Sequence, residues 1–262
     1  MSTLSLLKKL STATVGTAIV GLGVLGTPAM AVTLYQGFDP GIEPGQSRPN
    51  SDAAAANFDS DAAALGSVNL IDFENLTPGN YSTLTLGSGV TATWLNPNPY
   101  YQSISQLNNS LTGYNTTSGG SKFLSLGPGN PFAPVSLTLA FANPIQSWGA
   151  YFTGVQGAIG KYLVQFSDGS LQSLSLAEDN FGGVQFLGFT ASGKSISSIT
   201  IVGKPDSIGQ MGDIIGLDDM RYVYAPSDPT QSVPEPTSVL SLLGFSAFGV
   251  SSLLKRQQKM KG

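Results

Sequence analysis

The chain has 262 residues, a formal net charge of −4, and neither cysteine nor histidine. The missing cysteines exclude a disulfide framework and thiolate metal centres, and the missing histidines exclude Ser-His-Asp and Cys-His catalysis and imidazole metal sites. What remains is carboxylate chemistry, binding by neutral polar groups, or a cation held by oxygen ligands.

Residues 1–31 have the three parts of a secretory signal peptide. Lys8 and Lys9 supply a basic start, residues 10–25 are largely apolar, and Ala29-Met30-Ala31 forms an A-x-A cleavage site. We therefore predict that signal peptidase removes this segment and that the rest of the chain is exported. A permanent N-terminal helix is the alternative.

Residues 32–66 are predicted to form a lead-in and one short helix. Gly and Pro recur every few positions in residues 32–50, which indicates extended chain. Residues 51–65 are rich in alanine, with Ser51 or Asp52 as candidate N-cap and Gly66 as a stop. A disordered alanine-rich linker is the alternative for the helical segment.

The region 67–224 is predicted to form short β-strands almost throughout. Apolar and polar side chains alternate within the runs, and clusters of Gly, Pro, Asn and Ser separate them. Asp168-Gly169, between two such runs, is typical of a hairpin turn. The predicted strands are 68–74, 84–86, 89–94, 123–126, 135–141, 148–152, 162–166, 171–176, 183–189, 195–202 and 214–224. This pattern predicts one all-β domain, a β-sandwich of jelly-roll type.

After a linker at 225–233, residues 234–262 form a tail with three parts. Pro234-Glu235-Pro236 comes first, then an uncharged apolar run at 237–254, then a basic end with Lys255, Arg256, Lys259 and Lys261. As a helix the run would span about 27 Å, close to the bilayer core of about 30 Å, and the basic end favours the cytoplasmic side. We therefore predict a transmembrane helix at 237–254; an ordinary C-terminal anchor is the alternative.

This tail resembles the PEP-CTERM sorting signal of exported bacterial proteins, because the Pro-Glu-Pro motif directly precedes the apolar run and the basic end. The resemblance implies recognition by an exosortase-type membrane enzyme, cleavage near the motif, and transfer from the inner membrane to the cell surface or outer envelope. The region 67–224 is also similar, through segments 71–76, 149–154 and 213–220, to a domain type common among such proteins. That second resemblance implies no particular activity.

Between its terminal segments the chain is acidic. Six of the 12 basic residues lie in the two ends, whereas 15 of the 16 acidic residues lie between them, which leaves a formal charge of about −9 there. Such a charge repels nucleic acid and anionic lipid, so we expect no nucleic-acid partner. It suits cations, neutral sugars or basic partners.

Four carboxylates are candidate ligands of a structural calcium ion: Asp72 and Glu74 on the first predicted strand, and Asp218 and Asp219 on the last. The two-residue period buries Phe73 and puts its two acidic neighbours on the other face, while it puts Asp218 and Asp219 on opposite faces. The first and last strands of a jelly roll often lie side by side, and acids that meet there repel each other unless a cation neutralises them. The arrangement resembles the calcium site of carbohydrate-binding jelly rolls; solvated acids with basic neighbours are the alternative.

A second candidate site is a group of aromatic and amide residues that bind a glycan: Trp94, Asn96, Asn98, Tyr100 and Tyr101. Sugars stack their C–H faces on aromatic rings and pair their hydroxyls with amides, and exposed loops carry such sites. The alternative is that Trp94 ends a strand in the core and the tyrosines pack over it.

Together these features predict an exported, surface-sorted, non-enzymatic protein of the cell envelope or extracellular polysaccharide matrix, with a structural or adhesive role. A carbohydrate-binding, lectin-like module is the alternative. A glycoside hydrolase-type enzyme is a more distant one, because it needs two carboxylates about 5–10 Å apart and only Glu74 and Glu178 stand out.

Overall fold

The computed structural model describes residues 32–87, 89–128, 135–156, 161–166, 174–177, 179–204 and 213–226. The predicted signal peptide, the sorting tail, the turn at Asp168-Gly169 and Glu178 lie outside these ranges. The chain divides after Ala225 into two compact units, and the fold below belongs to the first. No helix within the described ranges is long and apolar enough to cross a lipid bilayer.

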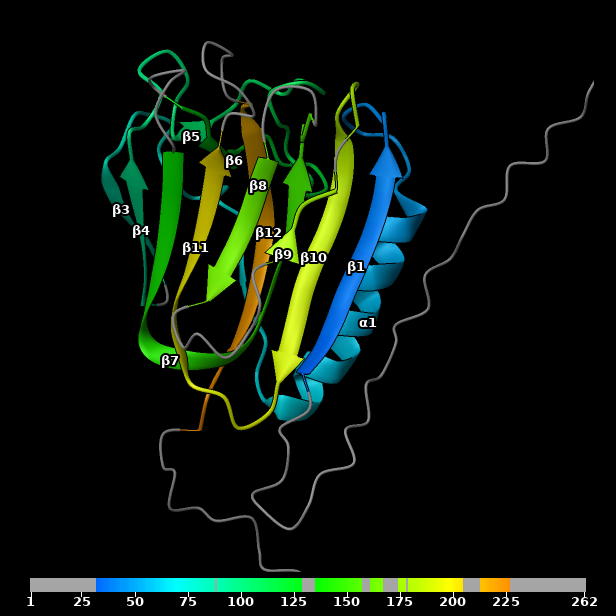
Figure 1. Ribbon diagram of the computed structural model, residues 1–262, viewed down its shortest axis with the longest axis vertical. Coiled ribbons are helices and arrows are strands. Elements are labelled where there is room, and N and C mark those ends of the chain that lie inside the picture. The colour runs from blue at the N-terminus through cyan, green and yellow to red at the C-terminus, as the bar shows by residue number, and fades with distance from the viewer. Residues whose placement is uncertain are drawn as a thin grey trace, which may run out of the picture. The chain divides into compact units, whose positions relative to one another are not determined.

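The described residues form one helix and twelve strands (Figure 1). The helix α1 covers Pro49–Leu65, and the strands are β1 (Val32–Pro40), β2 (Asn69–Ile71), β3 (Thr83–Gly87), β4 (Val90–Leu95), β5 (Ile104–Ser105), β6 (Phe123–Leu126), β7 (Val135–Thr153), β8 (Lys161–Phe166), β9 (Leu174–Ser175), β10 (Gly183–Ala191), β11 (Ile196–Lys204) and β12 (Ile215–Tyr224). Every predicted strand is therefore present, although β2 is shorter than expected and residues 171–173 of the strand predicted at 171–176 lie outside the described ranges.

The strands form two layers that share β7, which confirms the predicted β-sandwich. The first half of β7 lies between β4 and β11, and its second half lies between β10 and β12. One layer thus has the order β3-β4-β7-β11-β8-β9, and the other has the order β1-β10-β7-β12-β6-β5. Figure 1 shows β7 turning between the layers at the bottom of the view.

The bend in β7 joins two strands that the sequence predicts as separate. The ladder to β4 ends at Phe141, and the ladder to β12 begins at Ile145. Pro144 lies between these two ladders, so its missing backbone N–H removes no ladder hydrogen bond. The carbonyl of Pro144 instead accepts a hydrogen bond from the backbone of Ala225 at 2.8 Å. A proline is therefore compatible with a continuous strand at this turn.

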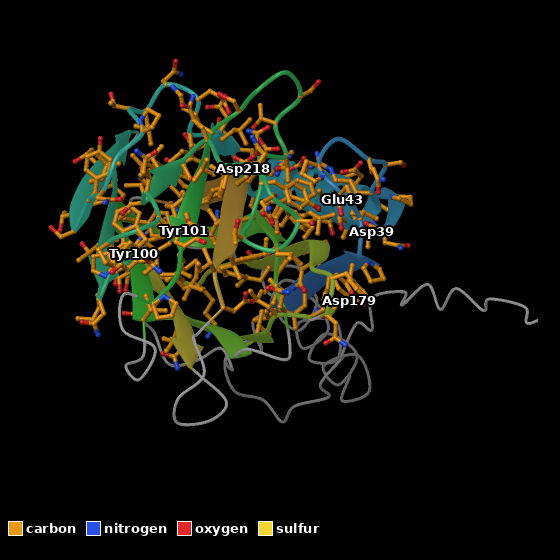
Figure 2. The ribbon with its side chains drawn as sticks, turned by 90° about the horizontal axis from the view of Figure 1, so that it is seen from above. Asp39, Glu43, Tyr100, Tyr101, Asp179 and Asp218 are labelled. Atoms are coloured by element: carbon orange, nitrogen blue, oxygen red, sulfur yellow. The ribbon has the colours of Figure 1, made fainter. Side chains whose placement is uncertain are left out.

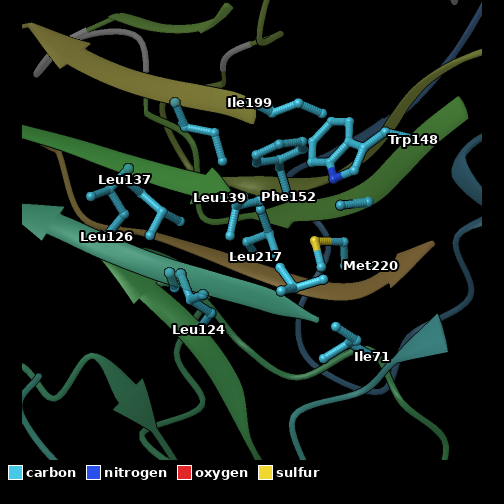
Figure 3. Close-up of a cluster of buried hydrophobic side chains, with 14 of the residues drawn as sticks. Ile71, Leu124, Leu126, Leu137, Leu139, Trp148, Phe152, Ile199, Leu217 and Met220 are labelled. Carbon is cyan, nitrogen blue, oxygen red and sulfur yellow. The ribbon is translucent and has the colours of Figure 1, made fainter. Parts of the chain in front are cut away.

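The main core lies between the two layers (Figure 3). Leu139 of β7 and Ile199 of β11 belong to one layer, and Phe152 and Leu217 belong to the other; all four are fully buried or nearly so. Trp148, which is 1% exposed, packs against Phe152 with ring centroids 6.1 Å apart. Burying each such side chain contributes about 1.5–3 kcal/mol to folding.

A second, smaller core lies under α1, on the outer face of the layer that contains β10. The strand period directs Phe152 into the sandwich and Tyr151 outward, where it packs against Phe186. Phe58 of α1 is fully buried against Phe186 and against Tyr35 of β1. The helix predicted in residues 51–65 is confirmed, and it covers this face of the sheet.

The predicted N-cap of α1 is wrong. The helix begins at Pro49, and its first free backbone N–H groups are capped by a residue from β1. Asp39 accepts hydrogen bonds from the backbone of Asn50 at 3.1 Å and of Ser51 at 2.8 Å, and from the Ser51 hydroxyl at 2.7 Å. The capping residue, Asp39, lies ten residues before the helix in the sequence, so the local rules for N-caps do not identify it.

Two strand pairings position the candidate site. β1 pairs with β10 along its whole length, so the extended lead-in is an edge strand of the sheet. The first and last predicted strands pair as expected, with Ile71 of β2 opposite Met220 of β12. Towards its start, β12 pairs with β6 instead, so β2 and β6 follow each other along one edge of β12.

Candidate functional site

An open depression of about 490 Å³ lies at the loop end of the sandwich. Its lining residues are Tyr101, from the connection before β5, and Gln106, Leu107, Asn108, Asn109 and Thr112, from the connection after β5. Every lining side chain is uncharged, one is aromatic and three are amides. Figure 2 looks down on this end, with Tyr100 and Tyr101 together on one side.

The lining keeps several polar groups available for a ligand. The Asn109 side-chain oxygen accepts a hydrogen bond from the backbone of Leu111 at 2.8 Å, while its amide nitrogen donates none within the described residues. The hydroxyls of Tyr101 and Thr112 likewise have no hydrogen-bond partner in the described part of the chain. An aromatic ring beside free amide and hydroxyl groups can stack on, and hydrogen-bond to, one small polar ligand.

The predicted glycan-binding residues separate into a core residue and an exposed group. Trp94 is 4% exposed, and its indole N–H donates to the Ser125 carbonyl at 3.1 Å. Trp94 therefore belongs to the core, which was the alternative to a glycan-binding role. Asn98 holds the loop in place, because its amide donates to the Pro128 carbonyl at 2.9 Å and its oxygen accepts from the Tyr100 backbone at 2.8 Å.

At the tip of that loop, Asn96 and Tyr100 are exposed. Asn96 follows β4 with a left-handed backbone angle of φ 54°, which asparagine adopts more readily than most residues. Tyr100 is 87% exposed, whereas Tyr101 is half-buried and lines the depression. The structure thus brings Tyr101 into the lining of the depression and leaves Tyr100 exposed outside that lining.

One wall of the depression is a compact turn formed by residues 106–113, which we call the wall loop. Within it, the backbone of Asn109 donates to the Gly113 carbonyl at 3.0 Å, and the backbone of Thr112 donates to Asn109 at 3.2 Å. Gly113 has φ +96° and lies so close to β12 that a Cβ there would be 2.7 Å from the Gly216 Cα. The wall loop therefore has a fixed shape and rests directly on the sheet.

Residues 114–122, which we call the anchored loop, follow the wall loop in the chain and are hydrogen-bonded to it. The backbone of Asn115 donates to the Asn108 side-chain oxygen at 2.6 Å, which links the two loops. Tyr114 is 2% exposed. Its backbone N–H donates to the Thr153 hydroxyl of β7, and its carbonyl accepts a hydrogen bond from the same hydroxyl. Its burial raises the pKa of the Tyr114 phenol, so this tyrosine remains neutral.

Glu74 fixes the C-terminal end of the anchored loop and links it to Asn115 near the start of the loop. Its Oε1 accepts hydrogen bonds from the backbones of Ser121 at 2.8 Å and Lys122 at 2.7 Å, and from the Asn115 amide at 2.8 Å. A Cβ at Gly120 would lie 2.5 Å from this oxygen, so the carboxylate needs a glycine there. Glu74 thus positions a loop, and its proposed hydrolase partner Glu178 lies outside the described residues.

Asp218 and Asp219 fix the other end of the anchored loop, and the prediction that they lie on opposite faces is wrong. The pairing of β12 with β7 shifts register between Asp218 and Arg221, and Asp219 has φ 46°. This bulge turns both carboxylates to the same neighbour, because the Thr116 hydroxyl lies 3.0 Å from Asp218 Oδ2 and 3.1 Å from Asp219 Oδ2. The backbones of Thr116 and Thr117 also donate to Asp218.

Asp218 is held in an unfavourable environment for a charge. Its side chain is fully buried, and Oδ1 has no hydrogen-bond partner among the described residues. Burial raises the pKa of Asp218 to about 7, and the neighbouring charge of Asp219 adds to the rise, while the hydrogen bonds from Thr116 oppose it. Part of the Asp218 population is therefore protonated at neutral pH.

The four predicted calcium ligands do not form one ligand set. Asp72 accepts a hydrogen bond from the backbone of Glu74 at 3.1 Å. Glu74 accepts from Asn115, Ser121 and Lys122, and Asp218 accepts from Thr116 and Thr117. In the part of the chain that the structure describes, no group of three or more acidic side chains converges on a point where a metal could bind. Each of these four carboxylates accepts a hydrogen bond from an N–H or O–H group of the chain.

The sequence did not single out the wall-loop residues of the depression. Its only local signal is the run of amides at Gln106, Asn108 and Asn109 after a short strand. Tyr101 and these amides are near one another in the chain, but no strand or helix pattern predicts that they line one hollow.

Comparisons with known proteins identify no family. No protein-family model matches the chain, and no curated protein matches it. Similar solved structures include a family 29 carbohydrate binding module (13% identity, covering 63% of this chain and 97% of that one, TM-score 0.31), CBM29_1 from Piromyces equi (11%, 62% and 93%, TM-score 0.33) and the K2 cleaved adhesin domain of Lys-gingipain (17%, 60% and 99%, TM-score 0.38). Likeness at this level carries no functional argument, so function is argued from the side chains alone.

Proposed function

We propose that this protein is a non-enzymatic glycan-binding module and that the depression beside Tyr100 and Tyr101 is its binding site. The observation that carries the proposal is an open hollow lined only by uncharged side chains, with Tyr101 in its lining and the adjacent Tyr100 87% exposed. The face of a sugar ring stacks on such tyrosines, and its hydroxyls pair with the free amide and hydroxyl groups of Asn109 and Thr112.

The chemistry of the site favours a neutral glycan. No lining residue offers a positive charge to a carboxylate or sulfate group, and the chain between its termini carries about −9. An anionic polysaccharide would therefore be repelled without any compensating ion pair, whereas a neutral one would not. This assignment selects the carbohydrate-binding alternative and gives the adhesive role a molecular basis.

The terminal segments supply the cellular setting of this proposal. The signal peptide at 1–31 and the tail at 234–262 would deliver the module to the cell surface, through signal peptidase and an exosortase-type enzyme. A surface module that binds neutral glycans would attach cells to extracellular polysaccharide, or crosslink that polysaccharide within a matrix. No catalytic step is assigned, because Glu74 is already bound to three donors of the anchored loop.

The proposal predicts that removing both tyrosine rings abolishes glycan binding. The full-length protein is run through native gels that contain neutral polymers (hydroxyethyl cellulose, xylan, galactomannan or dextran) or acidic ones (alginate or polygalacturonate). We expect at least one neutral polymer to retard the protein, no acidic polymer to do so, and Tyr100→Ala with Tyr101→Ala to remove the retardation. Leu34→Ala, which truncates an exposed side chain on β1, is the matched control and should migrate like the wild type.

Two results would contradict the proposal. One is that no neutral polymer retards the wild type. The other is that the double tyrosine variant, with an unchanged circular dichroism spectrum, is retarded as strongly as the wild type, which would exclude this depression as the site.

A further inference from the structure

A second exposed aromatic side chain lies on a turn beside the wall loop. Phe181 is 73% exposed, although a phenylalanine has no polar group that benefits from water. It belongs to the turn at residues 179–182, which precedes β10. Figure 1 shows β10 beginning at the end of the sandwich where β5 lies, and Figure 2 shows Asp179 of this turn on the other side of the view from Tyr101.

The turn that carries Phe181 is held firmly from both sides. The backbone of Phe181 donates to the Asp179 side chain at 2.9 Å, and the backbone of Gly182 donates to the Asp179 carbonyl at 3.0 Å. The backbone of Asp179 donates in turn to the Val155 carbonyl at 3.2 Å, and the Gly182 carbonyl accepts from Gly41 at 3.1 Å. The exposed ring therefore projects from a rigid support, which keeps the entropy cost of contacting a ligand small.

The turn also packs directly against the wall loop. Gly182 has φ +77°, and a Cβ at this position would overlap the Ser110 carbonyl of the wall loop. A Cβ at the neighbouring Gly154 would lie 3.1 Å from the Gly113 Cα. Backbone contact is thus continuous from the depression, through the wall loop, to the support of Phe181.

The wall loop presents apolar side chains between the two aromatic positions. Leu107, which also lines the depression, is 59% exposed, and Leu111 is 42% exposed. Asn108, Asn109 and Ser110 lie between these two leucines in the chain. Two leucines are far less than the roughly 800 Å² that a stable protein interface buries on each side. Spaced apolar contacts with amides between them suit a chain of sugar rings.

We propose that Phe181 is a second glycan-contacting platform, and that the ligand is an extended polysaccharide chain that crosses the wall loop from Tyr101 to Phe181. This inference rests on the proposed function and names its substrate class, because a site with platforms on both sides of a wall binds internal stretches of a polymer. Short oligosaccharides fill the depression alone and do not reach Phe181.

The test compares ligands of increasing length. The neutral polymer that retards the full-length protein is partly hydrolysed, and its disaccharide, tetrasaccharide and hexasaccharide fractions and the intact polymer are titrated calorimetrically. We expect wild-type affinity to rise with chain length. Phe181→Ala should weaken binding of the intact polymer about three- to tenfold and leave disaccharide binding unchanged, because it removes one aromatic contact that only long chains reach. Phe181→Tyr keeps a ring and should bind like the wild type.

The outcomes separate this inference from the proposed function. If the double tyrosine variant loses binding while Phe181→Ala binds the intact polymer as tightly as the wild type, the second platform is wrong and the depression remains the site. Equal weakening of disaccharide and polymer binding by Phe181→Ala would also overturn the extended-chain assignment. If no neutral polymer binds the wild type at all, both proposals are overturned.

Discussion

Substitution of Trp148 by alanine should lower the free energy of unfolding by about 3–5 kcal/mol. Trp148 is 1% exposed, it sits on the half of β7 between β10 and β12, and it packs against Phe152 inside the sandwich. The substitution leaves a cavity between the two layers that neither layer can close, because both are tied to the shared strand. The loss is a large part of the total stability of about 5–15 kcal/mol that is usual for a domain.

The measurement is urea denaturation of the purified protein followed by far-ultraviolet circular dichroism. Trp148→Phe keeps most of the volume and should cost about 1–2 kcal/mol, because the Trp148 indole N–H has no hydrogen-bond partner among the described residues. Trp94→Phe should cost more, since it leaves the buried Ser125 carbonyl without its donor. Phe181→Ala is the surface control, with an expected change within about 0.5 kcal/mol. If Trp148→Ala cost no more than Phe181→Ala, the two-layer core would be wrong.

Replacing Asp218 with asparagine should make the protein more stable at neutral and alkaline pH and change little in acid. The pKa of Asp218 is raised to about 7 in the folded state, above the ordinary aspartate value of 3.8. The folded state therefore binds more protons than the unfolded state between these values. This contribution to stability is fully present below about pH 4 and is lost as the pH rises through about 7.

The size of the effect follows from the raised pKa. Each pH unit by which folding raises a carboxyl pKa corresponds to about 1.4 kcal/mol, so Asp218→Asn should gain about 2–4 kcal/mol over the wild type near pH 8. The difference between the two proteins, measured by urea denaturation from about pH 4 to about pH 8, isolates this group from the other titrating residues.

Asp218→Ala separates the charge from the hydrogen bonds. It removes the acceptor of the Thr116 and Thr117 backbones, so it should be less stable than Asp218→Asn at every pH. A stability difference between Asp218→Asn and the wild type that does not change with pH would show that Asp218 carries no raised pKa in the folded protein.

The sandwich could be predicted from the sequence because its strands are encoded locally. Phe123–Leu126 is the same in the prediction and in β6, and the alternation of Leu137 and Leu139 with polar residues identifies the inward face of β7. Pairing of the first and last predicted strands followed from the expected topology. The continuity of β7 between residues 141 and 148 was not predicted, because nothing local shows that the strand turns from one layer to the other there.

The candidate site could be predicted only in part, because contacts with residues far away in the sequence, such as that of Gly113 with Gly216, fix the shape of the loop that lines it. The exposure of Tyr100 was expected from its loop, and the core position of Trp94 was the alternative that the structure supports. The bulge that turns Asp218 and Asp219 to the same threonine has no signature in a strand pattern. Asp218, Asp219 and Glu74 act as loop anchors because they accept hydrogen bonds from residues 114–122. These residues are far away in the sequence from all three acids.

The most direct test of the account is to observe which residues respond to a neutral glycan. The isotope-labelled full-length protein is titrated with the oligosaccharide fraction that binds it, and the backbone amide signals are followed by nuclear magnetic resonance. We expect the largest shifts on Tyr100, Tyr101 and the wall loop. Longer chains should extend the shifts to the turn at residues 179–182, and the sheet faces and α1 should not respond. Shifts confined to the sheet faces or to α1, with the wall loop unchanged, would contradict the proposed site.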